Sequence, residues 1–251
     1  MPRHPTLIDA RDVPAALGLL TRLPVSVDGA WAAERGAASA WAYPIAGIVL
    51  GILLSGISTA LSLFLPPAMT AALVLSVSVV VTGALHEDGL ADTCDGLWGG
   101  WTRERRLEIM KDSRIGAYGV IVIALSLLLR WLGLTLIIES GLWWALIAIP
   151  AASRAAMVPV MALRHAKQSG LSARVGRPRS ATIYLALALG ILALLPLGWP
   201  ALTVALLIAL AGSGAALIAW RKIGGQTGDI LGATQQIAEI AAYIALSAHL
   251  T

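Results

Sequence analysis

The chain has 251 residues, of which 58% are hydrophobic and only 13% are charged, and its mean hydropathy is +0.80. These values exclude an ordinary soluble domain and indicate a polytopic membrane protein whose first partner is the lipid bilayer. The net charge of +4 is better explained by membrane orientation than by nucleic acid, which we do not expect as a partner. Because Cys94 is the only cysteine, the composition also excludes an internal disulfide, a cysteine-built zinc site and a CxxC redox pair.

In chain order, residues 1–25 lack the clean apolar segment of a signal peptide, so we expect a retained cytoplasmic arm with a short amphipathic helix over residues 9–23. Six apolar runs then form three predicted membrane hairpins. A seventh run is interrupted by Gln235, Gln236 and Glu239, and either spans the membrane or packs beside the site. The seven runs cover residues 45–65, 68–85, 120–138, 142–163, 181–195, 201–220 and 230–250.

These runs predict one all-α domain over residues 1–251, a transmembrane helix bundle with about six to seven spans and short cytoplasmic and interfacial helices. Sixteen of the 18 Lys and Arg residues lie in the N-terminal arm and in the loops at the same predicted face, and none lies in the three tight turns. The positive-inside rule makes that face cytoplasmic. The other two, Arg130 and Arg154, lie inside apolar runs and need partners. We favour a structural ion pair or carbonyl contact for Arg130 and a phosphate-binding role for Arg154.

The segment at residues 83–119 holds seven of the 14 acidic residues. If residues 86–96 are helical, Asp88, Asp92 and Asp95 share one face within roughly 60°. Three carboxylates without an intervening basic residue favour a divalent cation, and Mg²⁺ binds through carboxylates and phosphate oxygens. The alternative, a solvated and charge-balanced segment, is the favoured interpretation for Glu104 and Glu108.

Two further polar segments lie at the same predicted face. Residues 164–180 are basic, which indicates either contact with anionic lipid headgroups or an anionic substrate. Residues 224–239 contain closely spaced glycines, which serve either helix packing or close approach to a ligand, and Asp229 is a further candidate oxygen ligand. Neither a P-loop nor a dinucleotide-binding glycine motif is present.

Two strings carry a family resemblance: HEDGLADTCDGL at residues 86–97 and RLEIMKDSRIGAYG at residues 106–119. Together they resemble the signature of the adenosylcobinamide-GDP ribazoletransferase family, also called cobalamin-5'-phosphate synthases. Further similar segments are LTRLPV at 20–25, YPIAGIVLG at 43–51, SRAAMVP at 153–159 and GGQTGDILGA at 224–233. At position 87 this chain has Glu where the family pattern leads us to expect an apolar residue.

The resemblance implies a Mg²⁺-dependent, multi-pass enzyme of late vitamin B12 assembly in a bacterial or archaeal cell membrane, with its active site facing the cytoplasm. Such an enzyme joins adenosylcobinamide-GDP to α-ribazole or its 5'-phosphate and releases GMP. It implies Asp88, Asp92 and Asp95 as metal ligands. The implied catalytic residues are Asp112, either as the base or as a further metal ligand, together with His86 and Lys111. The implied substrate-binding residues are Ser113, Arg114, Arg154 and Asp229.

Two other function classes fit parts of the pattern. Asp92-x-x-Asp95-Gly96 resembles the start of the CDP-alcohol phosphotransferase motif, but the acids that continue that motif are missing. A transporter would accommodate Arg130, Arg154 and an interrupted last helix, although the acids lie in a polar segment and not at the midplane. A homo-oligomer is one of the assemblies that the sequence allows.

Overall fold

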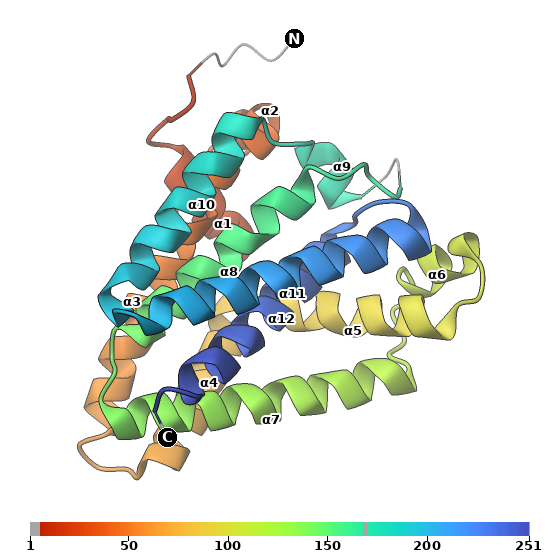
Figure 1. The fold of residues 1–251 in the computed structure, drawn as a ribbon. Coiled ribbons are helices and arrows are strands. Elements are labelled where there is room, and N and C mark those ends of the chain that lie inside the picture. The colour runs from red at the N-terminus through yellow and green to blue at the C-terminus, as the bar shows by residue number, and fades with distance from the viewer. Residues whose placement is uncertain (1–5, 168–169, 251) are drawn as a thin grey trace.

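The computed structural model describes residues 6–167 and 170–250, and within these ranges the chain is helical without a β-strand (Figure 1). The predicted all-α class is therefore confirmed. The elements in chain order are α1 (Asp12–Leu20), α2 (Gly29–Arg35), η1 (Gly36–Ala42), α3 (Tyr43–Leu61), α4 (Pro67–Thr82), α5 (Leu85–Gly99), α6 (Arg103–Ile109), α7 (Ala117–Ser140), α8 (Ala145–Met161), α9 (Leu171–Val175), α10 (Ser180–Leu194), η2 (Leu195–Leu197), α11 (Pro200–Ile223) and α12 (Gly228–Ser247).

Apolar helices dominate the molecule and indicate a membrane protein. Among the described residues, four helical stretches are long and apolar enough to cross a membrane: Gly29–Leu61, Ala117–Ser140, Ser180–Leu197 and Pro200–Ile223. Helices α4 and α5 meet this criterion only as one bent pair, which would make five, and α8 is a shorter apolar helix. This number is approximately consistent with the expected bundle.

A sharp break separates α4 from α5. The two helices meet at 85°, because Gly83 and Ala84 both adopt the left-handed conformation, with φ values of 63° and 55°. Glycine tolerates this conformation, whereas Ala84 has a Cβ and is strained there. After the break α5 runs beside α7 (Figure 1). Since α5 carries four carboxylates, we place it outside the membrane-spanning segments.

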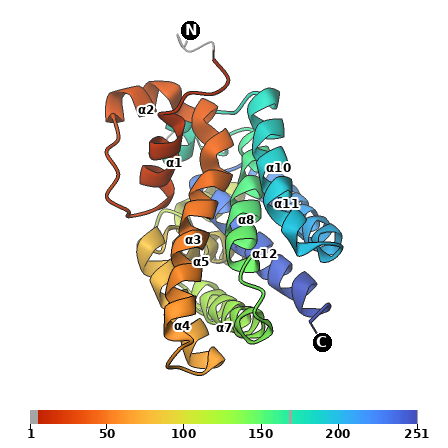
Figure 2. The same cartoon turned by 90° about the vertical axis from the view of Figure 1, so that its left-hand side faces the viewer.

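Helix α12 is the centre of the bundle. It packs against α5, α7, α8 and α11, and its C-terminal end emerges at the side of the bundle (Figures 1 and 2). At its crossing with α5 the two backbones touch: a Cβ on Gly89 would stand only 2.9 Å from the Asp229 carbonyl oxygen, and one on Gly232 would stand 3.3 Å from the Gly89 Cα. The last apolar run therefore packs beside the site, which was one of its two predicted placements.

The predicted hairpins are present as consecutive helices, but their main packing partners lie elsewhere. Helix α3 packs most extensively on α8, which also carries α10, while α7 packs on α4 and α5. Small residues explain why α3 packs mainly on α8. Gly47 and Gly51 on α3 let its backbone contact the α8 backbone at Pro150 and Leu146. In a membrane, close backbone approach of this kind selects helix partners more strongly than the connecting turns do.

Candidate functional site

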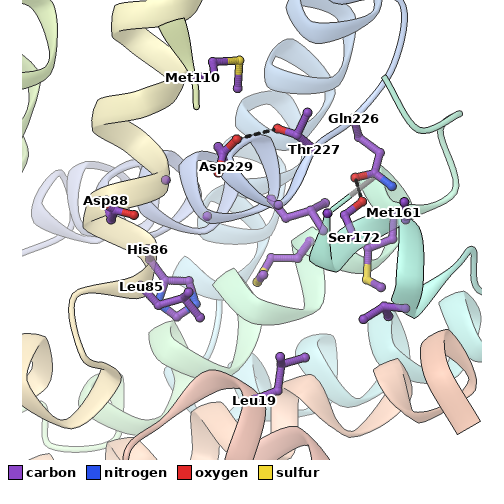
Figure 3. A pocket seen from close by; sticks show the side chains of 18 of the residues that line it. Leu19, Leu85, His86, Asp88, Met110, Met161, Ser172, Gln226, Thr227 and Asp229 are labelled. Carbon is purple, nitrogen blue, oxygen red and sulfur yellow. Dashed lines mark hydrogen bonds between the residues drawn. The ribbon is translucent and has the colours of Figure 1, made fainter. Parts of the chain in front are cut away.

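A cavity of about 330 Å³ lies where α1, α5, α8, α9 and the start of α12 converge (Figure 3). The break after α4 turns α5 toward α12, and the Gly89–Gly232 contact brings the first turns of both helices to the same cavity. The cavity therefore collects residues from the acidic segment, the basic segment at 164–180 and the glycine-rich segment at 224–239. Sequence analysis singled out these three polar segments separately.

Carboxylates form one side of this cavity. Asp88 and Asp229 line it, and Asp92 follows Asp88 by one helical turn. Thr227, the N-cap of α12, accepts a hydrogen bond from the Ile230 amide and donates one to Asp229 at 3.1 Å. Burial, together with the charges of Asp88 and then Asp229, raises the pKa of Asp92 to about 7. Burial also raises the pKa of Asp229. Without a bound cation, the carboxylates on this side of the cavity therefore repel one another, and a cation would relieve that repulsion.

Two lysines line the same cavity. Lys111 follows α6, and Lys167 belongs to the basic segment. Burial lowers the pKa of Lys167, while the nearby carboxylate of Asp229 opposes that shift. Carboxylates and ammonium groups around one cavity suit a phosphate group held together with a metal ion. Lys111 was an expected site residue, whereas Lys167 was not singled out in the sequence.

Asp95 has other partners. It is buried, and its two carboxylate oxygens accept hydrogen bonds from the backbone amides of Gly116 at 2.7 Å and Gly119 at 2.9 Å. It therefore caps the N-terminus of α7. Across the described ranges no group of three or more His, Cys, Asp or Glu side chains is arranged to hold a metal ion. The helical row of Asp88, Asp92 and Asp95 exists, but metal binding by all three stays a prediction.

The other expected catalytic residues are spread over the cavity and its surroundings. His86 lines the cavity and is 1% exposed, and its Nε2 atom has no hydrogen-bond partner among the described residues. Asp112 instead pairs with Arg114 at 2.7 Å near the surface, and hydrogen bonds from Arg114 lower the pKa of Asp112 to about 2. A carboxyl with so low a pKa is a weak base at neutral pH. Ser113 and Arg114 are exposed and lie outside the lining of this cavity, as far as the structure describes it.

A buried ionic network lies behind α5. Arg130, 2% exposed, donates to Glu87 at 2.6 Å, to Glu239 at 3.1 Å and to the Gln236 side-chain oxygen at 3.1 Å. The structural ion pair expected for Arg130 is confirmed. Arg154 is 1% exposed and donates to the Pro150 carbonyl.

Arg154 lies outside the lining of the cavity in the part of the chain that the structure describes. Its substrate-binding role therefore stays a prediction.

Sequence reasoning missed three acceptors of this network. Gln236 and Glu239 were taken as interruptions of a membrane span, and Glu87 as a departure from the family pattern. A signal was available, because two apolar runs each carry an arginine and a third carries a glutamate. Buried charges require partners, so these residues could have been expected to meet. The sequence could not show that the partners are 43 and 109 residues from Arg130 along the chain.

Fold and site together define a helical membrane protein with a cavity lined by carboxylates, lysines and apolar side chains. A family model described as cobalamin-5-phosphate synthase matches residues 12–247. The adenosylcobinamide-GDP ribazoletransferase of Bradyrhizobium diazoefficiens is 47% identical over 236 residues, which cover 91% of this chain and 90% of that protein. The protein of the same name from Mesorhizobium japonicum is 41% identical over 244 residues, which cover 96% and 94%. No solved structure matches significantly. The chain belongs to the cobalamin-5-phosphate synthase family.

Proposed function

We propose that this protein is an adenosylcobinamide-GDP ribazoletransferase. It transfers the cobinamide-phosphate group of adenosylcobinamide-GDP to α-ribazole or α-ribazole 5'-phosphate and releases GMP, giving adenosylcobalamin or its 5'-phosphate. The family match over residues 12–247 carries the proposal. The cavity supports it, because its carboxylates and lysines suit the transfer of a phosphate-linked group.

The reaction forms a bond between a ribose hydroxyl oxygen and phosphorus and breaks the bond from that phosphorus to the oxygen of GMP. Negative charge grows on the phosphate oxygens, and Lys111 and Lys167 are placed to neutralise it. The hydroxyl proton needs an acceptor at the cavity. His86 lines the cavity with an unpaired Nε2 atom and is the proposed acceptor, although burial lowers its pKa. Asp112 pairs with Arg114 and does not belong to the described lining of the cavity.

We also propose Mg²⁺ as the cofactor. Asp88 and Asp229 line the cavity, Asp92 lies one helical turn from Asp88, and carboxylate oxygens are ligands that Mg²⁺ prefers. These side chains do not by themselves form a three-ligand group in the described ranges, so phosphate oxygens of the substrate and water would complete the coordination. When bound, the ion would add positive charge beside the phosphate oxygens. Asp229 was expected as a further oxygen ligand, and metal binding by Asp95, which caps α7, is not part of this proposal.

The proposed location is a bacterial or archaeal cell membrane with the cavity open to the cytoplasm. The basic loops support it, because residues 164–180 and the segment after α5 both contribute to the cavity and both carry the positive charges that remain on the cytoplasmic side.

The function is tested by incubating the purified protein in detergent with adenosylcobinamide-GDP, α-ribazole and Mg²⁺. We expect GMP and adenosylcobalamin in equal amounts, measured by chromatography and mass spectrometry, and no GMP when α-ribazole is omitted. CMP release from a CDP-alcohol, with no GMP from the corrinoid, would identify the alternative phosphotransferase. Absence of turnover with all of these substrates would favour a transporter.

A further inference from the structure

The cavity has an apolar side that the phosphate chemistry leaves unexplained. We define the apolar wall as five residues of the lining from three elements: Leu19 and Leu20 of α1, Tyr43 of α3, and Met157 and Met161 of α8. Further apolar residues of the same lining include Leu85, Met110, Val175 and Leu231. The two methionines are one helical turn apart and therefore share a face of α8. In Figure 3, Leu19 lies across the cavity from Asp229. At Leu19 the apolar wall therefore faces the Asp229 side of the cavity.

The chemistry of the wall suits a flat aromatic ring. Methionine thioethers contact aromatic rings favourably and adapt to their shape, and leucines bury the ring faces. Two polar groups of the lining are engaged with each other, since Ser172 donates to the Gln226 oxygen at 2.7 Å and Gln226 contacts His165 Nδ1 at 2.8 Å. His86 Nε2 is unpaired and is left for one of the few polar atoms of the ligand. A ring with few polar atoms therefore fits this side better than a purine, which would leave its ring nitrogens unpaired.

The volume of the cavity indicates which of the two substrates it can enclose. A volume of 330 Å³ lies at the small end of the roughly 300–1,000 Å³ typical of pockets for drug-sized ligands. α-Ribazole, one ribose and one dimethylbenzimidazole, is of that size, whereas a corrin ring that carries GDP is several times larger. The hydroxyl that attacks phosphorus belongs to the ribose, and the base is bonded to the same ribose. When that hydroxyl is beside Asp88 and Lys111, the base therefore extends into the rest of the cavity.

We infer that the apolar wall of Leu19, Leu20, Tyr43, Met157 and Met161 binds the benzimidazole base of α-ribazole, while the corrin ring stays outside the cavity. This inference rests on the proposed function. It assigns the small nucleoside to the interior and makes α1, which lies before the first long span, part of the binding site.

The test uses Leu19, which is only half-buried, so that its truncation spares the fold. GMP release is measured with each substrate varied while the other is saturating. For Leu19→Ala we expect KM for α-ribazole to rise about tenfold, as loss of an apolar contact implies, with kcat and the KM for adenosylcobinamide-GDP unchanged. Leu19→Trp, which narrows the cavity, should raise the same KM further. Val13→Ala is the matched control, because Val13 is half-buried on the same helix but does not line this cavity.

A second measurement uses the wild type with the riboside of benzimidazole, which lacks both methyl groups. We expect kcat/KM to fall roughly tenfold or more, the usual penalty for unfilled apolar space. The inference is overturned if Leu19→Ala raises the KM for the corrinoid instead, if Val13→Ala has the same effect, or if loss of the methyl groups changes nothing. An inactive wild type is a different result: it overturns the proposed function, and the inference fails with it.

Discussion

Arg130 illustrates how single residues hold this protein together. Its guanidinium contacts Glu87 and Glu239, and Arg154 is the second buried arginine nearby. Two positive and two negative charges therefore balance in a region that offers little water. A balanced set of this kind costs less than an isolated charge in an apolar surrounding, but each member then depends on the others.

We therefore predict that Arg130→Ala destabilises the folded protein by about 3–5 kcal/mol, because it leaves two carboxylates buried without their counter-ion. Thermal unfolding in detergent measures this effect. Arg114→Ala removes a surface ion pair with Asp112 and should leave the melting temperature unchanged. Equal melting of the two variants would show that the buried network contributes nothing to stability.

The acidic residues of α5 divide into two groups. Asp88→Asn and Asp92→Asn remove charge beside the cavity, so we predict that half-maximal GMP release requires a higher Mg²⁺ concentration in each variant. Asp229→Asn should behave in the same way, since Asp229 lies on the same side of the cavity. The measurement is GMP release as a function of Mg²⁺ concentration, with thermal melts to confirm that the variants fold.

Asp95→Asn provides the contrast. It loses a charged cap of α7, and we predict a lower melting temperature with an unchanged Mg²⁺ requirement, at a cost of about 1–3 kcal/mol. A raised Mg²⁺ requirement in this variant, together with normal melting, would restore the metal role that the helical row suggested. The spacing in the sequence correctly places the three aspartates on one helix. It could not reveal that Gly116 and Gly119 turn their amides toward only one of them.

The crossing of α5 and α12 is the element on which the cavity depends. Added bulk at Gly89 meets the α12 backbone at Asp229, which cannot move without shifting the start of α12. We predict that Gly89→Ala lowers kcat/KM at least about tenfold, because a displacement of an ångström or less is costly at a reacting centre. Gly214→Ala, on α11 with open space around it, should retain activity and be slightly stabilised, by about 0.5–1 kcal/mol. Similar kinetics in both variants would mean that the contact is not needed.

Helix boundaries were predictable from the sequence, but helix partners were only partly so. The apolar runs locate α3, α4, α7, α8, α10 and α11 closely, because composition and turn residues are local signals. The central position of α12 is not a local property. Its glutamines and glutamate lower the hydropathy that marks a span. Their role as partners of buried charges is evident only in the fold, where Gln236 contacts Arg130 of α7 and Glu87 of α5. The cavity, built from the same crossing, could be predicted only as a set of separate polar segments.

At the scale of the whole molecule, the proposed orientation places α5 at the cytoplasmic side. Cys94 lies on this helix and is partly accessible. We predict that a membrane-impermeant maleimide labels inside-out vesicles and spares intact cells. Burial raises the pKa of Cys94 to about 11, so the thiolate is scarce at neutral pH and labelling should accelerate as the pH is raised. The readout is the mass shift of the protein, and Cys94→Ser is the blank. Labelling of intact cells would reverse the orientation.

The central position of α12 also has a consequence for biosynthesis. The ribosome releases α12 after all the helices that α12 packs against, yet α12 supplies Asp229 to the cavity and Glu239 to Arg130. Before α12 is released, Arg130 lacks one of its two counter-ions, and the cavity lacks the residues that α12 contributes. A nascent chain interrupted before Gly228 would therefore present an exposed defect to membrane proteases. Pulse-chase measurement should find that a chain interrupted before Gly228 is shorter-lived than a chain that contains α12.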